Sequence, residues 1–369
     1  MSEKFKRPEW APENAGTEYS SKVMEGVDLN NLKKKRKTFK KNEINTEDYI
    51  NGVLERDLGL FSRTITLVES NSREHMLKAQ EVLKGLLPYT GNSVRIGITG
   101  PPGAGKSTFI EALGTFLCDN GFKVAVLAID PSSTKTKGSI LGDKTRMEKL
   151  SREKNAFIRP SPSGGTLGGV ARKTRETLLV CEAAGYDVIL IETIGVGQSE
   201  ITVRSMVDFF MLLLLPGSGD ELQGIKKGVV ELADTIVINK ADGDYVKRAN
   251  ITKNSYIQAL RLLSPATKGW QTQVYTASAE TGKGIGDVWS GINDFLENTK
   301  QSGIFDRRRK EQMLEWFHSM IDDRLKAIFF ENDKIKDALK SKEKEIISGD
   351  ITPTLAVESL IDIFSERIK

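Results

Sequence analysis

Cysteine and histidine are scarce in this chain, whose 369 residues include only two of each. Cys118 and Cys181 both lie in stretches with a helical pattern, so the sequence indicates no disulfide framework and fits a reducing compartment. We therefore expect a cytoplasmic protein. His75 and His318 are too few and too isolated to form a zinc or nickel cluster.

Long apolar runs are also missing from the sequence. The longest, Phe209 to Leu215, is far shorter than the ~20 residues that a membrane-spanning helix needs. The first residues are charged and no apolar core follows them, so a signal peptide is not expected. We expect neither a membrane span nor a membrane partner.

Net charge is low as well, at +4, so the molecule as a whole is not expected to bind polyanions. The basic excess is concentrated at positions 33–41, which hold seven Lys or Arg residues and no acid. A solvated, disordered tail is the preferred interpretation of residues 1–44, and a nucleic-acid or membrane patch is the alternative. We expect no nucleic-acid partner.

The sequence does contain a phosphate-binding pattern. Gly100 to Ser107 reads G-x-x-x-x-G-K-S, directly after an apolar, β-branched run and before a helical pattern. A loop of this kind aims backbone N–H groups at phosphate, and the helix adds the positive end of its dipole. Lys106 would then reach the β- and γ-phosphates, and the Ser107 hydroxyl would contact Mg²⁺. The residues expected to hold the nucleotide here are Gly100, Pro101, Pro102, Gly103, Ala104, Gly105, Lys106, Ser107 and Thr108.

Short apolar runs rich in Val and Ile alternate with helical patterns after this loop. Such runs are typical of strands that are covered on both faces. The expected strands are 123–129, 156–159, 187–192, 208–215, 234–239 and 273–276, and the expected helices are 106–120, 170–184, 222–233, 245–263 and 285–298. This order predicts an α/β fold with a doubly wound, mostly parallel sheet.

A second motif, N-K-x-D, follows a buried strand pattern at Asn239-Lys240-Ala241-Asp242. The Asp242 carboxylate can accept from the ring N1–H and the 2-amino group of guanine, a donor pair that adenine lacks. Asn239 can bond the other edge of the base while the stem of Lys240 covers its face. A surface turn is the alternative, but the place of the motif after a P-loop and at a strand end favours a GTP site. The backbone loop that completes guanine recognition is expected at Ser278, Ala279 and Glu280.

Acidic residues at strand ends are candidates for contacts with Mg²⁺ and with the attacking water. Glu192 stands where small GTPases usually have Asp; it can hold Mg²⁺ while the Gly195 N–H meets the γ-phosphate. Asp130 and Asp143 are further candidates, with ordinary loop carboxylates as the equal alternative, and Gln198 is a weaker candidate to orient water. The candidate catalytic residues are Lys106, Asp130, Asp143, Glu192 and Gln198; the candidate metal ligands are Ser107, Asp130, Asp143 and Glu192.

The C-terminal part of the sequence has no strand signal. Leu314, Phe317, Ile321, Leu325 and Ile328 form the stripe of one amphipathic helix, and a last helix begins after residue 352. This stripe must be buried on its own domain or on a second subunit. We expect a tail at 1–44, a helical extension at 45–90, a P-loop GTPase domain at 91–300 and a helical arm at 301–369.

Several segments resemble the GTPase chaperones of methylmalonyl-CoA mutase, the MeaB/ArgK type of P-loop GTPase. The resemblance is strong over roughly residues 46–300 and looser in the arm. The matching segments are Arg63–Ser70, Arg95–Thr108, Ala128–Ser133, Gly142–Met147, Glu192–Glu200 and Gly219–Lys226.

The resemblance implies a Mg²⁺-dependent GTPase, cycling between GTP and GDP, that forms a homodimer through its C-terminal arm. It implies binding to an adenosylcobalamin-dependent mutase, with GTP hydrolysis coupled to loading and protection of that enzyme's cofactor. The family's switch regions correspond to Asp130–Arg146, Glu192–Glu200 and Gly217–Lys227. A metal-insertion GTPase and an ATP-dependent kinase of the same P-loop class are the alternatives.

Overall fold

The structure is a computed structural model that describes residues 5–6, 21–22, 44–130, 147–162, 167–193, 199–218 and 227–365. The chain divides into two compact units, Met1–Ile44 and Asn45–Lys369. In the first unit, strand β1 (Phe5–Lys6) pairs antiparallel with β2 (Ser21–Lys22). The basic run at 33–41 lies outside the described residues.

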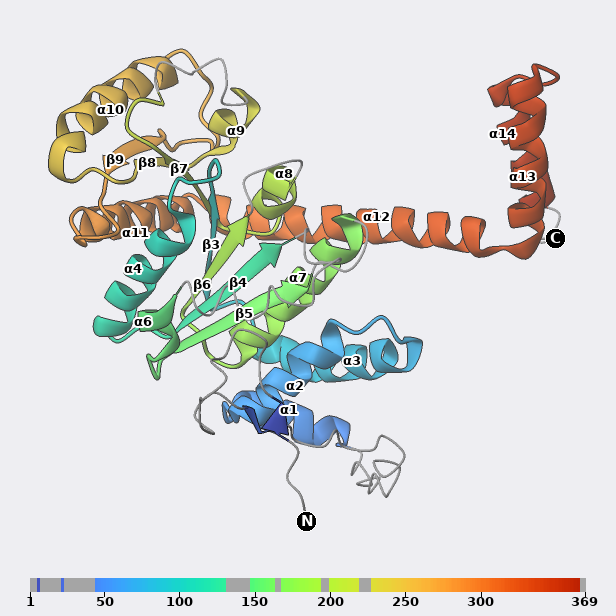
Figure 1. Ribbon diagram of the computed structural model, residues 1–369, viewed down its shortest axis with the longest axis horizontal. Coiled ribbons are helices and arrows are strands. Elements are labelled where there is room, and N and C mark those ends of the chain that lie inside the picture. The colour runs from blue at the N-terminus through green and yellow to red at the C-terminus, as the bar shows by residue number, and fades with distance from the viewer. Residues whose placement is uncertain are drawn as a thin grey trace. The chain divides into compact units, whose positions relative to one another are not determined.

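The second unit is built around a seven-stranded sheet with the order β5-β4-β6-β3-β7-β8-β9 (Figure 1). All of its pairs are parallel. The predicted α/β fold with a doubly wound parallel sheet is therefore confirmed. The strands are β3 (Val94–Thr99), β4 (Val124–Asp130), β5 (Ala156–Pro162), β6 (Val188–Thr193), β7 (Phe209–Leu214), β8 (Thr235–Ile238) and β9 (Gln273–Thr276).

The strands form because their apolar residues are covered on both sides of the sheet. Every residue of β7 and β8 is buried. The expected strand at 156–159 continues to Pro162, because β5 is an edge strand, where proline removes no required ladder hydrogen bond. The other expected strands differ from the observed ones by a residue or so at each end.

Helices cover both faces of the sheet (Figure 1). One face packs on α4 and α11, and the other packs on α7 and on the short helices that follow β6 and β7. The helices of the domain are α4 (Lys106–Asp119), α6 (Glu148–Ser151), α7 (Leu167–Ala183), α8 (Ser199–Arg204), α9 (Lys227–Leu232), α10 (Val246–Leu260) and α11 (Ile285–Gln301), with a 3₁₀ turn at Gly243–Tyr245.

Three N-terminal helices lie where the sequence has a helical pattern, and the structure packs them against α7. They are α1 (Thr46–Leu54), α2 (Leu58–Val68) and α3 (Arg73–Leu86), followed by a 3₁₀ turn at Leu87–Tyr89. Asn45 starts α1 with a capping box, since its side chain accepts from Asp48 N at 2.7 Å and its N–H donates to the Asp48 carboxylate. Phe61 and Ile65 of α2 join the same core cluster as Leu178 of α7.

The C-terminal part contains three helices, α12 (Ile304–Glu331), α13 (Asp333–Ser348) and α14 (Pro353–Ser365). The sequence pattern predicted α12 and α14 but not α13, whose few apolar residues are diluted by Lys, Asp and Glu. Two end signals are nevertheless present: Asn332 accepts from Lys334 N, and Gly349 ends the helix at φ +82°. Helices α13 and α14 pack against each other, with Ile335 and Leu360 buried.

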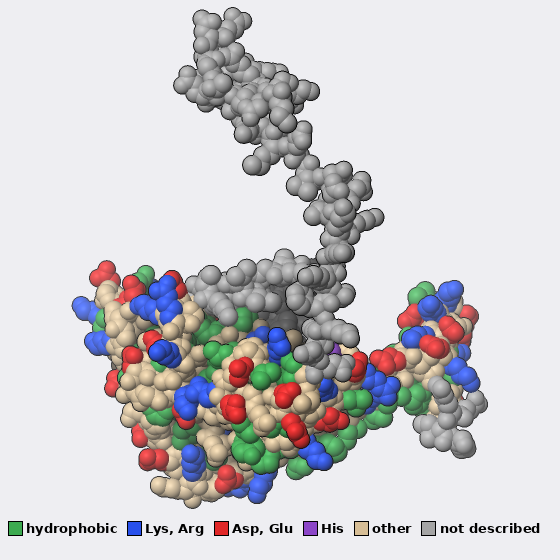
Figure 2. Space-filling view, turned by 90° about the horizontal axis from the view of Figure 1, so that it is seen from below, with side chains coloured by type: hydrophobic (Ala, Val, Ile, Leu, Met, Phe, Trp, Pro, Cys, Tyr) green, Lys and Arg blue, Asp and Glu red, His purple; other side chains and the backbone are tan. Residues whose placement is uncertain are grey.

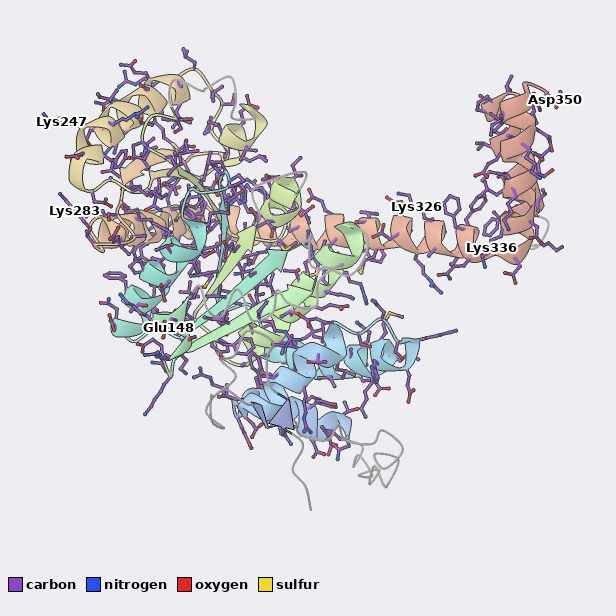
Figure 3. All side chains as sticks on the ribbon, viewed as in Figure 1. Glu148, Lys247, Lys283, Lys326, Lys336 and Asp350 are labelled. Carbon is purple, nitrogen blue, oxygen red and sulfur yellow. The ribbon has the colours of Figure 1, made fainter. Side chains whose placement is uncertain are left out.

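Much of α12 presents apolar side chains to solvent in the single chain. The apolar stripe predicted from the sequence lies on this one helix. Its residues Leu314, Phe317 and Leu325 are more than half exposed. Figure 2 shows hydrophobic side chains along this helix between the α/β domain and the last two helices. In Figure 3, Lys326 lies on this stretch of α12, Lys336 lies near the start of α13, and Asp350 lies at its far end. Within the described residues, no helix is both long enough and apolar enough to cross a membrane.

Candidate functional site

The glycine-rich loop joins the end of β3 to the start of α4, as the motif predicts (Figure 1). Gly100 has φ +156°, and a Cβ there would lie 2.3 Å from the carbonyl oxygen of Leu213. Gly105 caps α4 at φ +82°, and a Cβ there would lie 2.8 Å from Asn239 Nδ2. Both positions therefore require glycine. The backbone has a positive φ at each, and atoms of Leu213 and Asn239 leave no room for a Cβ.

Lys106 lies at the first position of α4 and is folded back over its own loop. Its ammonium group donates to Gly100 O at 2.9 Å and to Pro101 O at 3.2 Å. Burial lowers the pKa of Lys106, and the negative charges of Glu192 and Glu200 act in the opposite direction. The ammonium group is thus held by the loop backbone in this structure.

Ser107 and Glu192 meet at the end of two adjacent strands. Strand β6 pairs with β3 so that Glu192 lies beside Ile98, next to the start of the loop. Ser107 Oγ then donates to Glu192 Oε1 at 2.8 Å. A hydroxyl and a carboxylate are hard oxygen ligands of the kind that Mg²⁺ prefers, so this pair of residues fits the expected metal.

The N-K-x-D turn is joined to the phosphate loop by Asn239. Asn239 Nδ2 donates to Ala104 O at 2.9 Å, and Asn239 Oδ1 accepts from Ala279 N at 3.2 Å. Asn239 is 1% exposed, so these bonds hold it between the two loops. The amide therefore connects the phosphate loop, the N-K-x-D turn and the loop at 278–280.

Asp242 and Ser278 form a second contact between the N-K-x-D turn and the loop at 278–280. Ser278 Oγ donates to Asp242 Oδ2. The loops meet because β8 and β9 are parallel neighbours that end together at Ile238 and Thr276. Lys240 has φ +58°, a conformation that turns the chain sharply after Asn239. Glu280 is exposed at the edge of this loop.

Several predicted site residues lie outside what the structure describes. Asp130 ends β4, but its side chain is outside the described set, and so are Asp143, Gly195 and Gln198. The predicted switch regions are described only at their ends. The described residues that the fold brings together are Gly100, Pro101, Pro102, Gly103, Ala104, Gly105, Lys106, Ser107, Thr108, Glu192, Asn239, Lys240, Asp242, Ser278, Ala279 and Glu280.

Glu200 is a residue of this region to which the motifs assigned no role. It lies in the first turn of α8, is 5% exposed, and acts electrostatically on Lys106. Its place at the end of the Glu192–Glu200 segment was the available signal, but burial of one glutamate in a polar stretch cannot be read from the sequence.

The comparisons with known proteins agree with this geometry. A probable GTPase of Mycobacterium tuberculosis is 49% identical over 307 residues, which cover 83% of this chain and 91% of the relative. GTPase ArgK of Escherichia coli is 43% identical over 326 residues, covering 88% and 98%. The mitochondrial methylmalonic aciduria type A homolog of Mus musculus is 42% identical over 326 residues, covering 86% and 79%.

A solved structure and a family match extend these similarities to the fold. A protein described as an LAO/AO transport system kinase superposes with a TM-score of 0.71 at 36% identity, covering 88% of this chain and 99% of that one. Residues 61–334 match the family described as methylmalonyl Co-A mutase-associated GTPase MeaB. With its phosphate loop, its N-K-x-D turn and its parallel sheet, the chain belongs to the MeaB family of P-loop GTPases.

Proposed function

We propose that this GTPase is a Mg²⁺-dependent chaperone of an adenosylcobalamin-dependent acyl-CoA mutase, with methylmalonyl-CoA mutase as the expected partner. The observation that carries the nucleotide part is the junction at Asn239, which ties the phosphate loop to the N-K-x-D turn. Support for the partner comes from the family match and from the methylmalonic aciduria names of two relatives.

In this proposal each loop has one task. Residues 100–108 hold the phosphates, Asn239, Lys240 and Asp242 hold guanine, and the loop at 278–280 completes the base site. Ser107 and Glu192 would hold Mg²⁺, which supplies charge neutralisation at the phosphates. Asp130 and Asp143 remain candidate ligands, and Gly195 and Gln198 candidate contacts of the γ-phosphate and the attacking water.

Lys106 is the proposed electrostatic residue of the reaction. Its ammonium would leave the loop carbonyls of Gly100 and Pro101 and bind the β- and γ-phosphates. Replacing Lys106 with Ala should reduce GTP hydrolysis by about 10³-fold or more, the scale of other phosphate-clamping charges. A variant within tenfold of the wild type in a phosphate-release assay would contradict the assignment.

The partner is tested by mixing the GTPase with a purified acyl-CoA mutase. We expect co-elution in size-exclusion chromatography and a GTPase rate that rises when the mutase is added. The turn Gly217–Lys227 is the proposed sensing element, and the Lys106→Ala variant serves as the control for contaminating GTPase activity. Separate elution together with equal rates would contradict the chaperone proposal while leaving the GTPase itself intact.

The arm is proposed to join two copies of this chain. The exposed stripe on α12 continues into an apolar groove of about 470 Å³ between α12 and α14, lined by residues that include Phe329, Phe330 and Phe364. A second copy would offer the same stripe and groove, so the contact is self-complementary. On this proposal the chain is organised as a tail at 1–44, a helical extension at 45–90, a GTPase domain at 91–300 and a dimerising arm at 301–369.

A kinase is the second candidate, because the similar solved structure is described as a transport system kinase. The two candidates differ in the base that they bind. Competition of GTP and ATP for the purified chain decides between them, since the Asp242 carboxylate should favour guanine. A preference for ATP would favour the kinase.

A further inference from the structure

The turn between α8 and β7 is held by side chains from two other helices. Four of its main-chain carbonyls accept hydrogen bonds from such side chains, and they belong to Arg204, Ser205, Val207 and Asp208. Three of these four bonds come from α12, which runs beside the end of α8 (Figure 1). The position of α8 is therefore tied to the first turns of α12.

Gln312 of α12 supplies two of these bonds. Its Nε2 donates to Val207 O at 2.9 Å and to Arg204 O at 3.3 Å, and the residue is 8% exposed. Its Oε1 is shielded without a hydrogen-bond partner among the described residues. A buried amide that is only half satisfied contributes little to stability. Its hold on the turn after α8 is therefore what distinguishes it from an apolar side chain.

Arg175 of α7 joins the same turn to the same helix. Its Nη2 donates to Ser205 O and to Ser205 Oγ, each at 2.7 Å, and its Nη1 donates to Gln312 O at 3.1 Å. The guanidinium carbon also lies 5.6 Å from the centre of the Trp316 ring. The planar guanidinium thus fixes the end of α8 and α12 relative to each other.

Helix α8 connects this turn to the segment that precedes it in the chain. The helix packs directly on β3, the strand that leads into the phosphate loop, because a Cβ added to Gly97 would lie 2.8 Å from Val203 Cγ1. Its first residue, Ser199, directly follows the stretch from Gly195 to Gln198, the proposed contacts of the γ-phosphate and the attacking water. The position of α8 therefore sets where that stretch rejoins the fold.

We propose that Gln312 is a positioning residue for GTP hydrolysis, acting from the arm through α8. By fixing the C-terminal end of α8, it fixes the point at which the stretch that carries Gly195 and Gln198 ends. The inference rests on the proposed contacts of those two residues with the γ-phosphate and the water. Phosphoryl transfer leaves little covalent chemistry to the protein, so its rate depends on positioning.

The test compares Gln312→Met with the wild type in two assays. Single-turnover GTP hydrolysis measures the chemical step, and equilibrium titration with fluorescent GDP measures affinity. Methionine has a similar shape but no N–H donor, so hydrolysis should slow about tenfold, because a small misplacement far from the chemistry is enough for such a loss. Affinity for GDP should stay within about twofold, since the phosphate and guanine loops lie at the opposite edge of the sheet, whereas general damage to the fold would lower both.

Matched variants separate the possible outcomes. Phe305→Leu weakens the packing of α12 on the cluster that includes Phe295 of α11, away from α8, and should leave the hydrolysis rate unchanged. Arg175→Lys keeps a cation beside Ser205 without the planar fork and should also slow hydrolysis; it replaces Gln312→Met if that chain does not fold. An unchanged rate in Gln312→Met, an equal slowing in Phe305→Leu, or a parallel loss of GDP affinity overturns the inference alone. A wild-type chain that does not hydrolyse GTP overturns the proposed function and this inference with it.

Discussion

Arg309 of α12 holds the buried carboxylate of Asp208 with two parallel bonds, Nε to Oδ1 at 2.7 Å and Nη2 to Oδ2 at 2.6 Å. Asp208 lies just before β7 and is 1% exposed. The same guanidinium donates to Gly91 O and Ser93 O, each at 2.6 Å, just before β3. The first turns of α12 are therefore anchored at the edge of the sheet where its strands begin, opposite the phosphate loop.

Arg309→Ala should destabilise the whole domain. The change leaves the Asp208 carboxylate buried with one backbone donor, Arg95 N, and without its ion-pair partner. Breaking a buried pair in this way costs about 3–5 kcal/mol of the free energy of unfolding. Urea denaturation followed by circular dichroism measures the loss.

Arg307→Ala is the matched control, because it removes an arginine two positions away. Arg307 and Glu311 are both more than half exposed, and their charged atoms are 3.9 Å apart. Such a surface pair contributes about 0.5 kcal/mol or less. Equal losses for the two variants would mean that the Arg309–Asp208 pair contributes no more than a surface contact.

The sequence was sufficient for the sheet and the phosphate loop because their signals are local. Each of these signals spans only a few consecutive residues. They are the short apolar runs of the strands, the glycines from Gly100 to Gly105 and the Asn239–Asp242 turn. The Arg309–Asp208 pair could not be predicted, since its members are 101 positions apart and nothing in either local pattern identifies a partner. Helix α13 was missed because its apolar residues, such as Ile335 and Leu339, are few among many Lys, Asp and Glu residues, although they lie on one face of the helix.

The first turns of α12 contact the α/β domain, so a truncation that tests the dimer must leave these turns in place. A cut at residue 304 would remove Arg308 and Arg309, as well as Gln312, whose Nε2 donates to Val207 O at 2.9 Å. A chain ending at Ser319 keeps all three contacts and removes most of the exposed stripe. We expect this chain to be a folded monomer by light scattering and to bind GTP as tightly as the full chain.

Leu325→Glu tests the same interface without a truncation. Leu325 is 57% exposed in the single chain, so a charge there should leave the protomer's melting temperature nearly unchanged. In a dimer it would be buried at the centre of the stripe, and the dimer should dissociate at micromolar concentration. Asp323→Lys, on the opposite side of α12 by helical periodicity, is the control and should stay dimeric. A monomeric wild type would contradict the proposed interface.

Ser107→Ala and Glu192→Gln should each weaken nucleotide binding in a metal-dependent way. Both residues are proposed to hold Mg²⁺, and they contact each other at 2.8 Å. We expect GTP affinity to fall about tenfold or more in Mg²⁺, the scale of removing one hydrogen bond to a charged group, and to change little in EDTA. Isothermal titration calorimetry under both conditions measures the difference. An equal loss in EDTA would place these residues on the phosphates instead of the metal.

The base assignment leads to the most specific prediction, that Asp242→Asn exchanges GTP for xanthosine triphosphate. Xanthine carries a carbonyl where guanine carries the 2-amino group, and a carboxylate repels that carbonyl. An Asn amide at 242 would donate to the carbonyl while its oxygen accepts from N1–H. Affinity for GTP should fall and affinity for the xanthine nucleotide should rise, each by about 1–3 kcal/mol, the scale of a paired base-edge contact.

Competition binding of the two triphosphates to wild type and to Asp242→Asn measures this exchange. Hydrolysis of the xanthine nucleotide should persist, because Lys106, Ser107 and Glu192 are unchanged and lie at the other end of the site. Asp244→Asn removes an exposed carboxylate two positions away and should keep the preference for GTP. If Asp242→Asn also keeps that preference, the turn is an ordinary surface turn, and the Ser278–Asp242 contact serves only to join two loops.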